Sequence, residues 1–314
     1  MQSSAPSRRS LLRSVTGLAA AQASKEVLVA DRQQIAQVPW SAGSELPQTK
    51  APPNATDCHH HIYDSRFPMD ANAALRAGAA TVADYGLLQK RIGIRRHVII
   101  QPSSYGFDNR CLVDALTQSG STARGIAVIN PDVTESALRE LDKAGVRGIR
   151  LTLSRTSITT IEMAQPLARR VSERGWHVQV NGSPELILAA IPVLSRLPVP
   201  VIFDHLAHAG APGSPLFTSI ARLLQGGSAW VKLSGAYIDS KSGPPDYSDS
   251  STLAISYIKE APQRCLWGTD WPHPSVKSKP DDALLFDLLA RWTGNKRTFD
   301  QILVANPVSL FRFS

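Results

Sequence analysis

The stretch "ARGIAVINPDVTESALRELDKAGVRGIRLTL", residues 123–153, contains the pattern that decides the fold. It opens at 123–130 and closes at 146–153 with short runs rich in β-branched residues, which are typical of buried strands. Residues 134–145, between the two runs, have the composition of a helix and end at a glycine, where helices commonly end. A strand, a helix and a second strand in this order predict two parallel strands joined by a crossover helix.

The same alternation runs through most of the chain. Eight segments are predicted to be strands, namely 55–64, 95–102, 123–130, 146–153, 176–182, 199–208, 229–235 and 264–270. Helices are predicted at 134–145, 161–175, 184–198, 215–227, 251–262 and 282–294. This pattern predicts an α/β fold, the closed (β/α)8 or TIM barrel. A doubly wound sheet is disfavoured because neither a dinucleotide-binding glycine motif nor a P-loop follows any strand.

Composition and charge narrow the class of protein. The chain of 314 residues is 43% hydrophobic and 19% charged, which is ordinary for a globular protein. We expect the barrel to occupy residues 55–314, preceded at 24–54 by a polar arm or linker with four prolines that packs loosely on it. The net charge is +8, but the basic residues beyond the N-terminus are scattered and not interleaved with aromatics. This argues against a nucleic-acid partner and fits an anionic small substrate.

Residues 1–23 are predicted to be a targeting segment. The stretch "SRRSLLR" at 7–13 is similar to a twin-arginine export signal, and "SVTGLAAAQA" at 14–23 ends in an Ala-x-Ala cleavage pattern. The apolar run is too short to span a bilayer, so no membrane insertion is expected after its removal. The predicted location is the periplasm, or the cytoplasm if the signal is not functional. Three widely spaced cysteines, at 58, 111 and 265, predict no disulfide.

A candidate site comes from "DCHHHIYD" at 57–64. His59 and His61 lie two residues apart on the first predicted strand, so their side chains point to the same side, and His60 points to the other. His205 ends the sixth strand and Asp270 ends the eighth, and in a barrel the catalytic groups lie at these strand ends. Because the eighth strand neighbours the first, we expect the four residues to form one site. A locally satisfied histidine pair, and Asp270 as the cap of a following turn, are the structural alternatives.

Other polar residues are given roles according to their positions on the predicted strands. Arg150 is predicted to be buried on the fourth strand, where it would bind a substrate carboxylate or form an internal salt bridge. Asn181 ends the fifth strand and is predicted to contact the substrate. Lys232 and Ser234 are predicted to alternate inward on the seventh strand. The remaining histidines are assigned away from the chemistry, with His208 and His273 in loops or at the rim and His97 and His177 at strand starts.

These motifs together resemble the amidohydrolase superfamily, in the branch that contains 2-pyrone-4,6-dicarboxylate lactonase and related sugar-lactone enzymes. The resemblance rests on "DCHHHIYD", "QPSSYGFDN", "GIRLTL", "FDHLAH", "WVKLSGAY" and "WGTDWPHP" and covers about residues 55–313. It implies a hydrolase that opens a carboxylated lactone, with Asp270 as general base for water and His59, His61 and His205 polarising the carbonyl. It also implies substrate contacts from Ser103 and, at the rim, from Tyr105, Asn109 and Tyr237.

The departures from the family pattern bear on metal and substrate. Many members carry a metal-bridging residue where this chain has Arg150, and a metal-binding histidine near Asn181, so a two-metal site is not expected. Members of this branch can work without metal, and we expect no cofactor. The alternative is one divalent ion, such as zinc, on His59, His61 and Asp270, in a mononuclear metal-dependent hydrolase or decarboxylase.

The family often has an arginine where this chain has Ile238, so one anchor for an anionic group is missing. We therefore expect a lactone with one carboxylate and not pyrone dicarboxylate itself. The sequence contains no Gly-x-Ser-x-Gly motif, so a mechanism with a serine nucleophile is disfavoured. The oligomeric state stays open.

Overall fold

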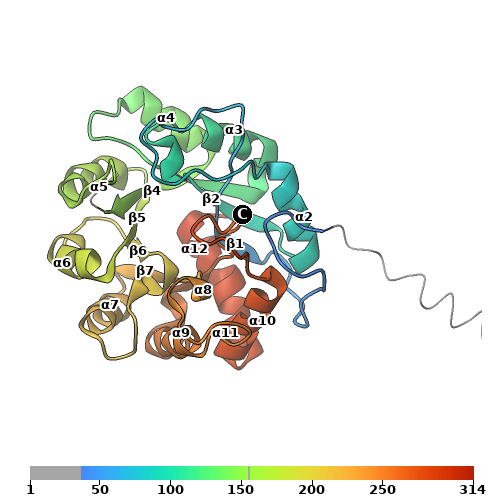
Figure 1. The fold of residues 1–314 in the computed structure, drawn as a ribbon. Coiled ribbons are helices and arrows are strands. Elements are labelled where there is room, and N and C mark those ends of the chain that lie inside the picture. The colour runs from blue at the N-terminus through green and yellow to red at the C-terminus, as the bar shows by residue number, and fades with distance from the viewer. Residues whose placement is uncertain (1–36, 155) are drawn as a thin grey trace, which may run out of the picture. The chain divides into compact units, whose positions relative to one another are not determined.

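The computed structural model describes residues 37–154 and 156–314, and the predicted targeting segment at 1–23 lies outside them. Eight strands form one sheet in the order of the sequence, and every pairing is parallel. They are β1 (Thr56–His60), β2 (Arg96–Ile100), β3 (Ala123–Ala127), β4 (Val146–Leu153), β5 (His177–Gly182), β6 (Val201–Phe203), β7 (Ala229–Leu233) and β8 (Cys265–Trp267). Figure 1 shows the strands at the centre with the helices around them. The (β/α)8 TIM barrel is confirmed.

Helices follow the strands as the alternation requires. The α-helices are α2 (Val82–Ile92), α3 (Arg110–Ser119), α4 (Glu135–Ala144), α5 (Ala164–Ser172), α6 (Pro184–Leu194), α7 (Pro215–Gln225), α8 (Ala236–Asp239), α9 (Ser248–Glu260), α10 (Asp282–Thr293), α11 (Lys296–Asp300) and α12 (Asn306–Phe311). The sequence patterns did not single out α2 and α3. A capping box at Thr81 and Asp84 starts α2, and Leu88 and Ile92 bury its inner face. These contacts outweigh the internal glycine, Gly86.

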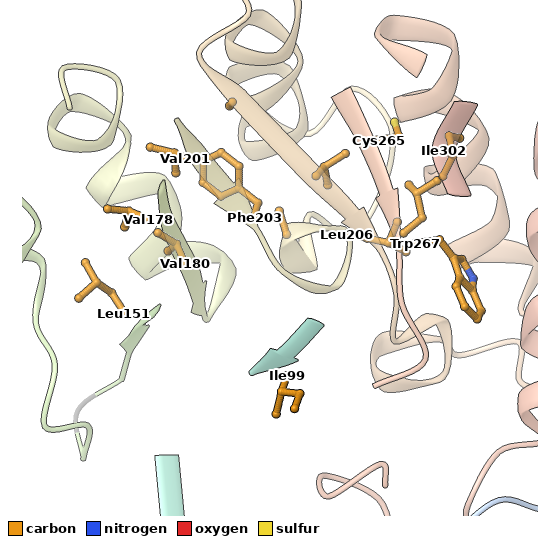
Figure 2. Close-up of a cluster of buried hydrophobic side chains, with 14 of the residues drawn as sticks. Ile99, Leu151, Val178, Val180, Val201, Phe203, Leu206, Cys265, Trp267 and Ile302 are labelled. Atoms are coloured by element: carbon orange, nitrogen blue, oxygen red, sulfur yellow. The ribbon is translucent and has the colours of Figure 1, made fainter. Parts of the chain in front are cut away.

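Two apolar clusters fill the two faces of the sheet. On the helix side, Val178 and Val180 of β5 pack with Val201 and Phe203 of β6 (Figure 2). The alternate positions point into the barrel. They form a second cluster that contains Val98, Ile100, Ile126, Ile202, Trp230 and Leu266, closed by Phe311 and Phe313 from the end of the chain. The polar residues of the candidate site lie beyond this apolar floor.

The described part of the arm, residues 37–54, is held more firmly than its composition predicted. Val38 is 1% exposed. The buried side chain of Arg91 in α2 donates to the carbonyl of Glu45 at 2.9 Å and to Ser41 Oγ at 3.1 Å. The same guanidinium pairs with Asp281 at 2.7 Å, so the arm is tied both to α2 and to the start of α10. Charge-assisted hydrogen bonds that are shielded from water hold the arm in place, although its polar composition predicted loose packing.

Two further expectations concern the covalent state and the membrane. All three cysteines are buried and unpaired, which confirms the absence of a disulfide. Within residues 37–154 and 156–314, no helix combines the length and the apolar composition needed to cross a bilayer.

Candidate active site

The four residues singled out at the strand ends lie together. Asp270 Oδ1 is 3.5 Å from His59 Nε2, 3.4 Å from His61 Nε2 and 3.8 Å from His205 Nε2. The exposed fraction of each residue is 5% or less. His60 points away, and its ring stacks on Tyr85 of α2 at a centroid distance of 3.6 Å. The alternation along β1 therefore placed these side chains as predicted.

Left-handed backbone presents two of these side chains. His205 has φ 50° and Asp270 has φ 64°, and both follow the ends of their strands. Such angles are costly for residues other than glycine, and they concentrate at functional sites. Gly235 after β7 also has left-handed backbone, at φ 65°. A Cβ at this position would lie 2.9 Å from His205 Nδ1, so glycine is required here on both grounds. The side chain of Asp270 does not cap a turn: it accepts a 2.7 Å hydrogen bond from the hydroxyl of Tyr237.

The hydrogen bonds fix which ring nitrogens carry protons. His59 Nδ1 lies 3.0 Å from Lys232 Nζ and 3.3 Å from Asp204 Oδ1. The shorter contact is with an ammonium group, which only donates, so we assign Nδ1 as the acceptor and place the proton of His59 on Nε2. His61 Nδ1 lies 2.9 Å from the carbonyl of Ile100, which only accepts, so Nδ1 of His61 carries a proton. The two Nε2 atoms are 3.3 Å apart, which suits donation from His59 to His61.

A buried charge cluster lies against the histidines. Lys232 is 0% exposed and contacts Gln179 Oε1 at 2.7 Å and Asp204 Oδ1 at 3.0 Å. Arg150 Nε donates to Asp204 Oδ2 at 3.0 Å. Burial raises the pKa of Asp204, but its contacts with Lys232, His59 and Arg150 outweigh this effect and hold that pKa well below its usual range. Asp204 therefore stays ionised and keeps its two cations in place.

The same balance sets the protonation of the site. Burial raises the pKa of Asp270, but His205, His61 and His59 outweigh it and hold the pKa well below its usual range. Burial, followed by the charge of Lys232, lowers the pKa of His59. Burial lowers the pKa of His205 to about 4 against the opposing charge of Asp270. At neutral pH the site therefore holds an ionised Asp270 beside neutral His59 and His205.

The donor set can be tested against a single metal ion. His59, His205 and Asp270 offer ligand atoms that all lie within 4.8 Å of one another, a separation that would suit one ion. A ligating nitrogen must offer a lone pair, however, and Lys232 leaves a proton on His59 Nε2. Histidines that bind metals usually donate their other ring nitrogen to an acceptor. Here Asp204 Oδ1 lies 3.3 Å from His59 Nδ1, but the ammonium group of Lys232 is nearer, at 3.0 Å. The distances fit an ion, and the proton assigned to His59 Nε2 opposes one.

The predicted substrate contacts fall into two groups. Arg150 and Tyr237 lie in the centre of the site, because Arg150 contacts Asp204 and Tyr237 contacts Asp270. Asn181 is partly buried, and its Oδ1 lies 3.0 Å from His208 Nε2.

The other group lies in the loop that follows β2. Ser103 is exposed. Tyr105 is buried, and its hydroxyl accepts from the amide of Asp64 at 2.9 Å. Asn109 bonds both the amide and the carbonyl of Val128, at 3.1 and 2.8 Å. The polar groups of Tyr105 and Asn109 thus hold loops together.

Sequence reasoning missed several residues around the centre. Tyr63 continues the alternation of His59 and His61, and its buried hydroxyl has no hydrogen-bond partner among the described residues. Asp204 directly precedes His205, and its alternation with Ile202 on β6 would have pointed it inward. His273, assigned to a loop or the rim, lies in the loop after β8 but not at the rim, since it is 0% exposed and has a left-handed φ of 56°.

The comparisons with known proteins agree with this geometry. The sequence profile of the family described as Amidohydrolase matches residues 56–313. A 2-pyrone-4,6-dicarboxylate hydrolase of Comamonas testosteroni is 30% identical over 87% of this chain and 94% of that protein. A 4-sulfomuconolactone hydrolase of Hydrogenophaga intermedia is 31% identical over 83% and 89%. A D-galactarolactone isomerase of Agrobacterium fabrum is 28% identical over 85% and 94%.

The fold is also that of a solved structure. The crystal structure of an Agrobacterium tumefaciens protein in its apo state matches with a TM-score of 0.81 and 26% identity, covering 88% of this chain and 99% of that chain.

Proposed function

The chain belongs to the amidohydrolase family, and from this premise we propose that it is a hydrolase that opens a lactone carrying one carboxylate. Two of the similar proteins are named as hydrolases of lactone-type rings, which supports hydrolysis of a cyclic ester. The observation that carries the proposal is the carboxylate of Asp270, which lies 3.4 to 3.8 Å from three imidazoles at the mouth of the barrel.

Asp270 has the position and charge of a general base. Tyr237 holds its Oδ2, which leaves Oδ1 facing the histidines. In the proposed reaction, Oδ1 takes one proton from water as the water oxygen bonds to the lactone carbonyl carbon. The tetrahedral intermediate then collapses, the ring C–O bond breaks, and Asp270 returns the proton to the leaving oxygen. General-base assistance of this type contributes about 10²–10⁴-fold.

The three histidines have different roles in the proposed reaction. His59 is the main donor to the developing oxyanion, since Lys232 leaves its proton on Nε2. His205 Nδ1 lies 3.1 Å from Ser234 Oγ, and a hydroxyl that donates there leaves the proton of His205 on Nε2 as a second donor. In the free site His61 Nε2 accepts the proton of His59, and in the proposed reaction the lactone carbonyl oxygen replaces it as the acceptor. This revises the expectation that all three histidines polarise the carbonyl.

Arg150 is the proposed anchor for the substrate carboxylate. Its Nε is held by Asp204, and this is its only hydrogen bond to the described residues, so both terminal nitrogens remain for a substrate oxygen pair. It lies near the reacting groups, because its charge adds to the lowering of the His205 pKa. Ile238, where the family often has arginine, supplies no second cation.

We also propose that no metal takes part, on the ground of the proton on His59 Nε2. A mononuclear metal-dependent hydrolase or decarboxylase remains the second candidate, because the ligand atoms lie close enough for an ion. Elemental analysis of purified protein separates the two. The metal-free reaction predicts full activity after chelation, and one zinc per chain whose removal abolishes activity would establish the second candidate.

The reaction itself is tested by the mass of the product. Purified protein is incubated with 2-pyrone-4,6-dicarboxylate, 4-sulfomuconolactone, D-galactarolactone and an uncharged lactone. Hydrolysis adds one water to the mass, isomerisation leaves the mass unchanged, and decarboxylation removes carbon dioxide. Addition of one water to a carboxylated lactone supports the proposal, and an unchanged mass with a new retention time would replace it by isomerisation.

Export is proposed on the sequence of residues 1–23, with the periplasm as the location. Mass spectrometry of protein from its native host tests it. Cleavage after Ala23 is expected, and an intact N-terminus in periplasmic protein would contradict the proposal.

A further inference from the structure

A chain of three polar side chains extends behind Asp270, away from the histidines. The hydroxyl of Tyr237 lies 2.7 Å from Asp270 Oδ2, and His273 Nδ1 lies 2.9 Å from the same hydroxyl. His273 Nε2 lies 3.1 Å from Asp282 Oδ2. His273 and Asp282 are both 0% exposed. Neither residue takes part in the reaction proposed above.

Counting the protons gives this chain a direction. An ionised carboxylate only accepts, so Tyr237 donates its single hydroxyl proton to Asp270. Burial and the charge of Asp270 raise the pKa of Tyr237, so the hydroxyl keeps this proton. The hydroxyl oxygen must then accept from His273 Nδ1. A neutral ring protonated at Nδ1 would direct the lone pair of Nε2 at Asp282, so with an ionised Asp282 both ring nitrogens of His273 carry protons.

The surroundings favour this ion pair. Asp282 is the first residue of α10, where the helix dipole stabilises a negative charge. The arm seals the pair from water, since the indole of Trp271 donates to the carbonyl of Pro39 at 2.7 Å and buried Ser41 lies beside the Asp282 amide. Asp282 Oδ1 has no hydrogen-bond partner among the described residues, so its charge is balanced mainly through His273.

We propose that His273 and Asp282 are positioning residues that act through Tyr237 to hold Asp270 as the base. The imidazolium of His273 orients the Tyr237 hydroxyl. That hydroxyl fixes Oδ2 of Asp270, and Oδ1 is thereby kept facing the attacking water. This inference rests on the proposed function for its catalytic meaning, whereas the ion pair itself does not depend on any substrate.

The ion pair is tested by NMR of protein labelled with ¹⁵N-histidine, without substrate. The His273 signals are identified by their loss in His273→Gln. Both ring nitrogens are expected in the protonated range at neutral pH, and one of them should leave it in Asp282→Asn. A singly protonated His273 in the wild-type protein would overturn the inference, even if no lactone is opened.

The positioning role is tested by kinetics on 4-sulfomuconolactone or 2-pyrone-4,6-dicarboxylate, whichever the wild type opens faster. Tyr237→Phe should lower kcat roughly 10–100-fold, the effect of one hydrogen bond to a charged group, with little change in KM. His273→Gln should lower kcat in the same direction. The double variant should be no slower than Tyr237→Phe, because His273 acts only through the hydroxyl.

Tyr257→Phe is the matched control, since the Tyr257 hydroxyl is buried without a hydrogen-bond partner among the described residues. It should leave kcat at the wild-type value. Fully multiplied losses in the double variant would contradict action through Tyr237. Wild-type kcat in well-folded His273→Gln would likewise reduce the chain to a structural role.

Discussion

The main-chain amide of Asp270 donates a 2.7 Å hydrogen bond to the carbonyl of His59. Asp270, the proposed general base after β8, and His59 on β1 are thus joined through the backbone as well as through their side chains. The amide of His61 adds a second bond, to the carbonyl of Trp271 at 2.8 Å. The ends of the chain's eighth and first strands therefore close the barrel where the chemistry is proposed.

This close approach predicts that Gly268 is intolerant of any side chain. A Cβ there would lie 2.6 Å from the Cβ of His59 and 2.7 Å from its amide nitrogen, so β1 and the segment after β8 would have to separate. We expect Gly268→Ala to lower both the melting temperature and the activity. Gly86→Ala in α2 is the matched control, because nothing lies within 4 Å of its Cβ position. It should stabilise the protein by about 0.5–1 kcal/mol. Equal melting temperatures for the two variants would contradict the account of barrel closure.

Arg150 is predicted to set the preference for charged substrates. Arg150→Met should lower kcat/KM for carboxylated lactones roughly 10–100-fold, since a hydrogen bond to a charged group is lost. Uncharged lactones should lose much less. The melting temperature should also fall, because buried Asp204 loses one of its cations. Parallel kinetics on both substrate types make the test, and equal losses on both would reduce Arg150 to a salt-bridge residue.

The buried histidines predict unfolding in mild acid. Burial lowers the pKa of His97 and of His177 to about 3 and that of His205 to about 4, against 6.5 in the unfolded chain. Below pH 6.5 these histidines bind protons in the unfolded state but not in the folded state. The free energy of unfolding therefore falls by about 1.4 kcal/mol per pH unit for each histidine. Burial raises the pKa of Asp57 to about 6, which opposes this between pH 6 and 3.8, and the imidazolium proposed at His273 opposes it too. These are two groups against five, because burial also lowers the pKa of His59 and of His60.

Urea unfolding at several pH values between 7 and 4.5 measures the effect. The free energy of unfolding should decrease as the pH falls, and His97→Gln should flatten the slope by about one histidine's share. A free energy that stays level or rises toward pH 4.5 would contradict the protonation states assigned to the interior.

Lys232 is predicted to keep a metal out of the site. In Lys232→Met the ammonium group that directs the proton of His59 to Nε2 is gone, so Nδ1 can carry the proton and Nε2 can offer a lone pair. Zinc retained after incubation and gel filtration should rise from well below one per chain in the wild type toward one in the variant. Stoichiometric zinc in the wild-type protein, as purified, would show that the lysine has no such effect.

The strands and the four central residues were predictable because each depends on a local pattern. β-branched runs identify the strands, and a closed barrel brings the ends of β1, β6 and β8 to one mouth. His59, His61, His205 and Asp270 could therefore be grouped without coordinates.

The burial of His273 was not predictable. It depends on the left-handed backbone of His273 itself and on the start of α10 at Asp282, nine residues after His273. Side-chain direction in turns follows no period. The firm packing of the arm was not predictable either, because the residues that hold it, Arg91 and Asp281, are distant in sequence.

The most direct measurement of the central claim is the turnover of Asp270→Asn on the carboxylated lactone that the wild type opens fastest. Asparagine keeps the shape of the side chain and an acceptor for Tyr237, but it cannot take a proton from water. We expect kcat to fall by about 10²–10⁴-fold, with circular dichroism and KM close to those of the wild type. Near-wild-type lactone hydrolysis by well-folded Asp270→Asn would contradict the assignment of Asp270 as the base.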